Sequence, residues 1–188
     1  MVTPSKTRIR ADEFYQLPEY TDDARIELID AEVFHLMPIR LKHQLIAGAI
    51  HVILWLHAAQ NGGRAYQAPT EIYLDDENIY QPDVFYLKPD TACVEQETRV
   101  VGAPDLVVEV LSPSTAKRDR QEKYAAYEKH GTGEYWIVDP AHDVLEVWTR
   151  QDGKFQRLGA YGPDDTLKSP LLSQDVSLKT IFSTAQQA

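Results

Sequence analysis

The sequence has little cysteine, no long hydrophobic run and fewer basic than acidic residues. Its single cysteine, Cys93, excludes an intramolecular disulfide and a cysteine-based zinc site. The longest apolar stretch, at 45–59, contains His51 and His57 and is shorter than the roughly 20 residues of a membrane span, so we expect a buried core helix. Residues 1–13 are polar and basic without a following apolar segment, which predicts a cytoplasmic protein with no membrane partner.

The formal net charge is −10, which counts against a broad basic surface for nucleic acid. Acidic residues around a cation site could account for part of this excess, although solvated surface carboxylates account for most of it. The 188 residues, 43% of them hydrophobic, are enough for one compact domain with a core.

Strand and helix patterns alternate along residues 1–188, which we interpret as a single domain. Its parts are an N-terminal helix and hairpin at 10–38, a core at 42–150 and a tail at 164–188 that wraps the surface. Helical spacing covers 11–19, 42–60 and 116–131. Strand patterns cover the hairpin 25–38 and the segments 64–75, 79–88, 104–112, 134–140, 143–150 and 154–162. This order predicts an α/β sandwich in which helices flank a central mixed β-sheet.

Two carboxylates, Asp83 and Glu109, stand on strands that this order makes neighbours. Alternation within PDLVVEVLS buries Glu109, which therefore requires a cation, a hydrogen-bond network or a raised pKa. The alternative for Glu109 is a pair with a basic side chain, and for Asp83, after Pro82, a solvated turn. Two such carboxylates supply the oxygen ligands that Mg²⁺ prefers. Asp105 shares the face of Glu109 and could add a third metal ligand, but a turn or cap role suits it equally.

Three further side chains are candidates for the same site. Lys123 lies on the helix face that packs toward the sheet, where its charge could stabilise a transition state. Helix geometry alone favours an exposed Lys123 paired with Asp119. Glu27, for which Glu32 is an alternative, could add a carboxylate, and His43 could act as a general base or contact a phosphate.

Four ordered blocks within about residues 10–150 carry a family resemblance: ELIDAEVFHLMP, APTEIYLDDENIYQPDVFYLKP, GAPDLVVEVLSPSTAKRDRQEKYAAYEKHG and EYWIVDP. Together they resemble the Uma-two (Uma2) family, in the PD-(D/E)XK nuclease superfamily. The resemblance implies a restriction-endonuclease-like fold and divalent-metal phosphodiester hydrolysis, with Asp83 as the motif aspartate and Glu109 at the (D/E) position. The motif lysine is replaced by Leu111, and the resemblance points to Lys123 as its substitute. Family members commonly have glycine where this chain has Ala31.

We therefore predict an endonuclease that hydrolyses DNA phosphodiester bonds with Mg²⁺, for which Mn²⁺ can substitute. The missing motif lysine and the acidic charge favour an alternative, a non-catalytic nucleic-acid-binding or regulatory module with the same fold. Hydrolysis of a smaller phosphate substrate is a third hypothesis, because the same metal site attacks any phosphodiester. A homodimer is expected because two sites related by a two-fold axis would cut both strands of a duplex.

Overall fold

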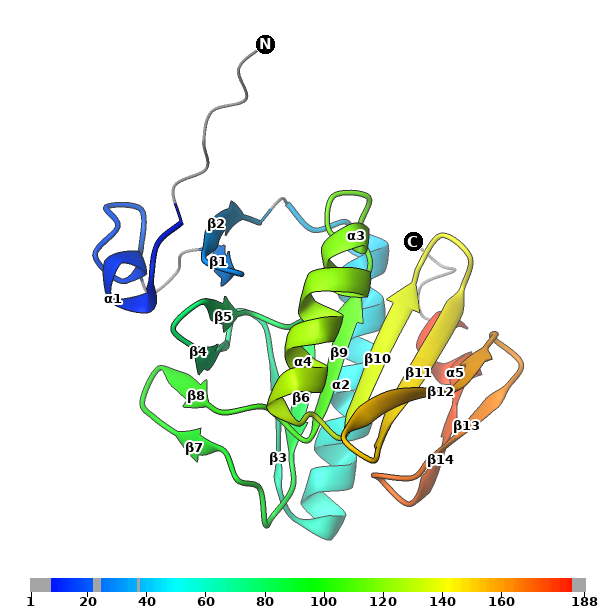
Figure 1. Ribbon diagram of the computed structural model, residues 1–188. Coiled ribbons are helices and arrows are strands. Elements are labelled where there is room, and N and C mark those ends of the chain that lie inside the picture. The colour runs from blue at the N-terminus through cyan, green and yellow to red at the C-terminus, as the bar shows by residue number, and fades with distance from the viewer. Residues whose placement is uncertain (1–7, 22–24, 37, 184–188) are drawn as a thin grey trace.

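The computed structural model describes residues 8–21, 25–36 and 38–183. They form two six-stranded mixed sheets, a two-stranded hairpin and several helices, arranged so that one helix lies in front of the central sheet and a longer one behind it (Figure 1). The predicted fold class is confirmed. The second six-stranded sheet, which packs beside the front helix, was not expected.

The central sheet has the strand order β12-β11-β10-β9-β6-β3. Its strands are β3 (Arg64–Gln67), β6 (Val84–Leu87), β9 (Leu106–Val110), β10 (Glu134–Asp139), β11 (Val144–Gln151) and β12 (Lys154–Tyr161). Strands β9 and β10 run parallel, with Glu109 opposite Ile137, whereas β6 runs antiparallel to β9. All five residues of β9 are buried, as its nearly continuous apolar sequence indicates.

The second sheet has the order β2-β1-β5-β4-β8-β7. Its strands are β1 (Ile26–Ile29), β2 (Glu32–His35), β4 (Glu71–Asp75), β5 (Asn78–Tyr80), β7 (Val94–Glu95) and β8 (Arg99–Val101). The segments 64–75 and 79–88, each predicted as one strand, are in fact two strands that belong to different sheets. Pro69 and Pro82 stand at the two crossing points, because proline lacks the N–H that a continuous ladder requires.

The hairpin predicted at 25–38 is confirmed over residues 26–35 by the antiparallel pairing of β1 with β2, and residue 37 lies outside the described residues. Its turn residues Asp30 and Ala31 have φ values of 49° and 62°. Both are in the left-handed region that a two-residue hairpin turn demands. Glycine adopts this conformation without the cost that a Cβ adds.

The long helix α2 (Leu41–Asn61) covers the back of the central sheet. Ile46, Ile50 and Leu54 are fully buried in a core with residues of β9 and β10. The prediction of a buried helix is correct only for this face, since the opposite face carries exposed Leu41 and Trp55. The N-terminal helix α1 (Ala11–Phe14) is shorter than predicted. Among the described residues, no helix is both long and apolar enough to cross a membrane.

The helix predicted at 116–131 connects β9 to β10 across the front of the sheet (Figure 1). It consists of α3 (Ala116–Arg118), a π-helical turn (Asp119–Lys123) and α4 (Tyr124–His130). Gly131, with φ 102°, ends it in the left-handed conformation typical of a helix C-terminus. The π-helical turn was not predicted, and it contains a candidate site residue.

The expected surface tail at 164–188 is wrong for the residues up to 183. They form β13 (Thr166–Ser169), β14 (Gln174–Ser177) and α5 (Leu178–Ser183), and their apolar side chains join the core behind the central sheet. Buried Glu134 of β10 fastens this segment by accepting hydrogen bonds from Ser169 Oγ and Leu171 N. Sequence reasoning missed this because the apolar positions are spread over three short elements.

Candidate active site

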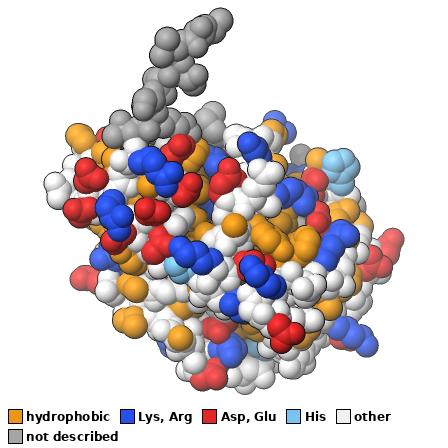
Figure 2. Space-filling view, in the orientation of Figure 1, with side chains coloured by type: hydrophobic (Ala, Val, Ile, Leu, Met, Phe, Trp, Pro, Cys, Tyr) orange, Lys and Arg blue, Asp and Glu red, His pale blue; other side chains and the backbone are white. Residues whose placement is uncertain are grey.

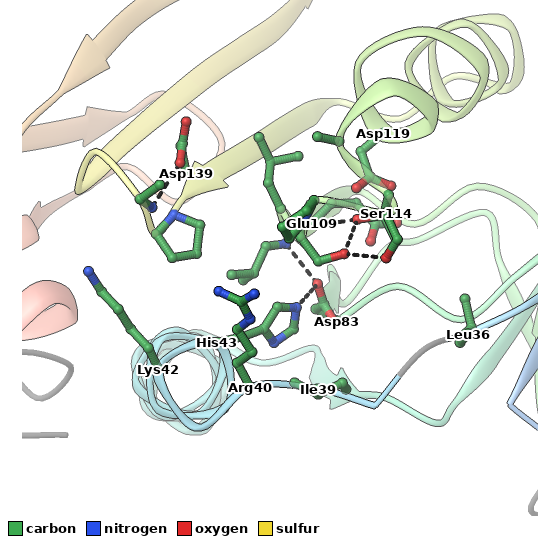
Figure 3. A pocket seen from close by; sticks show the side chains of 18 of the residues that line it. Leu36, Ile39, Arg40, Lys42, His43, Asp83, Glu109, Ser114, Asp119 and Asp139 are labelled. Atoms are coloured by element: carbon green, nitrogen blue, oxygen red, sulfur yellow. Dashed lines mark hydrogen bonds and ion pairs between the residues drawn. The ribbon is translucent and has the colours of Figure 1, made fainter.

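A cavity of about 690 Å³ opens at the carboxyl ends of β9 and β10, beside the start of α2. Crevices at the carboxyl ends of strands are where open α/β sheets bind ligands. Five of the predicted site residues line this cavity, and Figure 3 shows three of them, His43, Asp83 and Glu109. The five are Glu27, His43, Asp83, Glu109 and Lys123.

Lys123 joins the two sheets at the floor of this cavity. Its Nζ donates to Glu27 Oε1 at 2.8 Å and to Glu109 Oε1 at 2.9 Å. Tyr127 Oη, one helical turn further along, donates to the same Glu109 oxygen at 3.0 Å, and Gln81 N donates to Glu27 Oε1. Only 4% of Lys123 is exposed. The alternative of an exposed Lys123, which helix geometry alone favours, is therefore wrong.

Asp119 and Lys123 stand at the two ends of the π-helical turn, and both are buried. The helix carries these two residues, and then Tyr127, toward the sheet at four-residue intervals, and π-helical turns often occur at functional sites. Asp119 Oδ1 lies 3.9 Å from Lys123 Nζ and has no hydrogen-bond partner among the described residues. Asp119 is thus a site residue that the sequence suggested only as a surface partner of Lys123.

Three buried carboxylates therefore surround one ammonium group. Burial alone would lower the pKa of Lys123, but the charges of Glu109, Glu27 and Asp119 outweigh it and raise that pKa well above its ordinary value. Burial raises the pKa of Asp119 to about 6, although Lys123 opposes this. Burial likewise raises the pKa of Glu109, with Lys123 again opposing. The floor of the cavity thus holds three carboxyl groups and one ammonium group, and a further cation bound there would favour the ionised form of the carboxyl groups.

Asp83 stands on the other side of Glu109, just before β6. Its Oδ2 accepts a hydrogen bond from Val110 N at 2.7 Å and lies 3.2 Å from His43 Nε2 in the first turn of α2. Burial lowers the pKa of His43, but the hydrogen bond and charge of Asp83 prevail and raise it. His43 therefore gains a clear role as the partner of Asp83.

Two other candidates lie elsewhere. Asp105 Oδ2 accepts a hydrogen bond from Lys88 N and Oδ1 lies 3.8 Å from Lys88 Nζ, so Asp105 ties the entry of β9 to the end of β6 and does not reach the cavity. The turn role, not the metal role, describes it. Glu32 opposes Ile29 in the β1–β2 hairpin and is likewise outside the cavity lining.

Basic and hydroxyl side chains form the rim above this acidic floor. Arg25, Arg40 and Lys42 line the cavity, and Lys42 pairs with Asp143 at 2.8 Å. Ser112, Ser114 and Thr115, in the loop that follows β9, line the opposite wall. Acidic and basic side chains are interspersed on the face seen in Figure 2, so this face carries no broad basic surface.

A divalent cation suits the donors present at the floor. The contacts named above use one oxygen of Asp83, Oδ2, and one of Glu109, Oε1. Across the described ranges, no three His, Cys, Asp or Glu side chains form a group that could hold a metal. Mg²⁺ usually needs only one or two carboxylates, with waters and substrate phosphates completing its octahedron. Asp83 and Glu109, which both line the cavity, would supply the carboxylates of such a site.

Comparison with known proteins agrees with this architecture. A family model described as "Uma2: Putative restriction endonuclease" matches residues 11–180. Among solved structures, the crystal structure of a protein from Anabaena variabilis, described as a putative nuclease belonging to DUF820, superposes with a TM-score of 0.76. The two chains are 23% identical, and the match covers 94% of this chain and 99% of the other. No curated protein matches.

Proposed function

Because the chain belongs to the Uma2 family, which is described as "Putative restriction endonuclease", we propose that it is a Mg²⁺-dependent endonuclease that hydrolyses DNA phosphodiester bonds. Asp83 and Glu109 are the proposed metal ligands. The observation that carries the proposal is the burial of Lys123 between Glu27 and Glu109 at the floor of the cavity that Asp83 also lines. A buried ammonium held by carboxylates beside a cavity is an arrangement that catalysis uses and that stability alone rarely rewards.

Each side chain at the floor has its own proposed role. When bound, Mg²⁺ supplies Lewis-acid polarisation of the scissile phosphate and lowers the pKa of a bound water. Lys123 places a fixed positive charge where negative charge develops on the phosphate oxygens. Glu27 and Tyr127 are positioning residues, because each contacts Lys123 or Glu109 and holds it in place. His43 holds Asp83 Oδ2 through the contact described above.

The rim supplies the contacts that would hold the nucleic-acid backbone. Arg25 and Arg40 offer guanidinium groups that suit phosphate oxygens, and Ser114 and Thr115 offer hydroxyl donors on the facing wall. These few contacts are compatible with a net charge of −10, provided that binding depends on the local rim. We accordingly expect binding that weakens steeply as salt rises.

A non-catalytic DNA-binding module is the second candidate. It is favoured by Leu111, which stands where the linear motif has lysine and packs in the core between the helix and the two sheets. In that case the cavity would still bind nucleic acid, but no strand would be cut. The two functions differ only in turnover, so an assay of cleavage separates them.

The test compares supercoiled, linear and single-stranded DNA with Mg²⁺, Mn²⁺ or EDTA. We expect metal-dependent cleavage that Asp83→Asn and Glu109→Gln each reduce at least 100-fold, as the loss of a metal ligand or charge-stabilising group typically does. Asp105→Asn is the matched control, because it removes a carboxylate from the same strand region but outside the cavity. Cleavage that survives both site substitutions contradicts the proposed site. Binding without cleavage by the wild type would instead favour the second candidate.

A further inference from the structure

The outer face of α2 carries a row of large apolar side chains that the fold leaves in contact with solvent. Leu41 is 75% exposed, Val52 53% and Trp55 56%, and Leu45 and Leu56 are also exposed. The positions 41, 45, 48, 52, 55 and 59 follow one another at alternating intervals of four and three residues, the spacing of a helix-pairing seam. We call these six positions, together with Leu56, the α2 seam. A contiguous exposed apolar row of this kind marks an interaction site.

The α2 seam is uncharged in a chain that is strongly acidic. Every exposed residue of α2 is apolar or an uncharged amide: Leu41, Gln44, Leu45, Val52, Trp55, Leu56, Ala59, Gln60 and Asn61. A partner recognised by charge, such as DNA or a basic peptide, finds no complementary group there. A second copy of a chain with net charge −10 is repelled at acidic faces, but this repulsion is smallest at an uncharged seam.

Gly48, near the middle of the seam, has no explanation within one chain. A Cβ placed on it would meet nothing within 4 Å, so no neighbouring atom requires a glycine there. Glycine inside a helix is unfavourable relative to alanine. Gly48 lowers helix stability and is open on its outer side, so another molecule can approach the helix closely there.

We propose that the α2 seam pairs with the α2 seam of a second copy in an antiparallel, two-fold symmetric dimer. When two such helices align so that paired residue numbers add to about 100, Leu45 meets Trp55, Gly48 meets Val52 and Leu41 meets Ala59 of the partner. Each pair sets a larger side chain against a smaller or flatter one, and Val52 enters the space that Gly48 leaves. A two-fold contact of this kind is isologous, because the same surface serves both copies.

The size of the seam limits the area that two copies can bury. A helix of 21 residues is about 31 Å long and about 10 Å wide with its side chains. The footprint is therefore about 310 Å² per face and about 620 Å² for two faces, which is below the roughly 1,200 Å² of standard specific interfaces and typical of weak, transient ones. We therefore expect a dissociation constant in the micromolar range. The proposal does not depend on the nuclease function, since it concerns a face of α2 that points away from the core.

The first experiment is analytical ultracentrifugation of the intact chain from about 1 to 100 µM. We expect a concentration-dependent dimer that Trp55→Glu converts to a monomer, with at least a 100-fold weaker association. Val94→Glu is the matched control, because Val94 is 59% exposed on β7, away from the seam, and its replacement should leave the dimer intact. Gly48→Leu should raise the melting temperature of the chain at low concentration while weakening the dimer, since leucine favours helix but fills the space for Val52.

The second experiment tests the antiparallel register. Leu45→Cys and Trp55→Cys are made separately in a Cys93→Ser background, so that the introduced thiol is the sole cysteine of each chain. Oxidation of the mixture should give a disulfide-linked dimer, and oxidation of either variant alone should not. Cross-linking of Leu45→Cys to itself overturns the antiparallel arrangement. A wild type that is monomeric at 100 µM, or a dimer that Trp55→Glu leaves unchanged, overturns the proposal and assigns the seam to another protein or to none.

Discussion

Replacing Lys123 by methionine tests the buried charge cluster most directly. Methionine retains the length of the side chain but removes the ammonium group that lies 2.8 Å from Glu27 Oε1 and 2.9 Å from Glu109 Oε1. At an effective dielectric constant near 20, each of these contacts is worth roughly 6 kcal/mol before desolvation. Desolvation of the ammonium offsets several kcal/mol of this. Removing one partner of a buried ion pair costs about 3–5 kcal/mol in net stability, and we expect a loss of that size at pH 8.

The loss should shrink as the pH falls. Without the ammonium, the pKa values of Glu109 and Asp119, which burial already raises, rise further above those of the unfolded chain. Groups with raised folded-state pKa values contribute stability that is complete below the unfolded pKa, near 4, and is lost as pH rises through the folded pKa. As the pH falls, the carboxyl groups of Glu109 and Asp119 in the variant take up protons on folding. The variant should therefore approach the stability of the wild type at pH 5 and fall furthest below it at pH 8.

The measurement is urea unfolding at pH 5 and pH 8, with two comparison variants. Lys117→Met removes an exposed lysine from the same helix and should change stability by about 0.5 kcal/mol or less. Adding Glu27→Gln to Lys123→Met should restore part of the loss at pH 8, because one unpaired carboxylate is removed. If Lys123→Met unfolds like Lys117→Met at pH 8, the buried ion pairs do not hold the two sheets together and the reasoning fails.

Three further substitutions have expected outcomes. Ala31→Gly should stabilise the chain by about 1 kcal/mol, because residue 31 has φ 62° and glycine avoids the steric cost of a Cβ at positive φ. An unchanged or lower melting temperature would contradict this. Asp119→Asn should stabilise the fold above pH 6 by about 3 kcal/mol at most. Burial raises the folded-state pKa of Asp119 to about 6, so the wild-type fold loses stability as pH rises through that value, and the variant does not. Identical gains in stability at pH 4 and pH 8 would exclude that cause. Glu134→Ala should lower the free energy of unfolding by about 3–5 kcal/mol, because it leaves the buried donors of Trp136, Ser169 and Leu171 unpaired. Glu134→Gln should cost less, and the urea midpoints of the two variants should therefore differ.

The sequence predicted best those features that local patterns determine. Hydrophobic periodicity located α2 to within a residue at each end, and the near-continuous apolar run of β9 marked it as a central strand. These features depend on residues close in sequence, for which periodicity is a direct physical signal.

The features that the sequence did not predict depend on contacts between distant residues. Pro69 and Pro82 each mark a break, but nothing local to them indicates that the chain crosses from one six-stranded sheet to the other. The burial of Lys123 depends on Glu27, 96 residues away in sequence, so helix spacing alone favoured the exposed alternative. The core position of Phe182 similarly depends on α2 and the central sheet.

The position of the lysine has a consequence for how the site assembles. A lysine in the linear motif would stand at residue 111, on the same strand as Glu109, but Leu111 instead packs into the core between the sheets. The ammonium is supplied by Lys123, which reaches Glu109 only when the helix that follows β9 docks on the sheet. It reaches Glu27 only when the second sheet is also in place. The charge arrangement at the cavity floor thus requires both sheets and the helix to be packed together, so a substitution that loosens any of these contacts should reduce activity as well as stability.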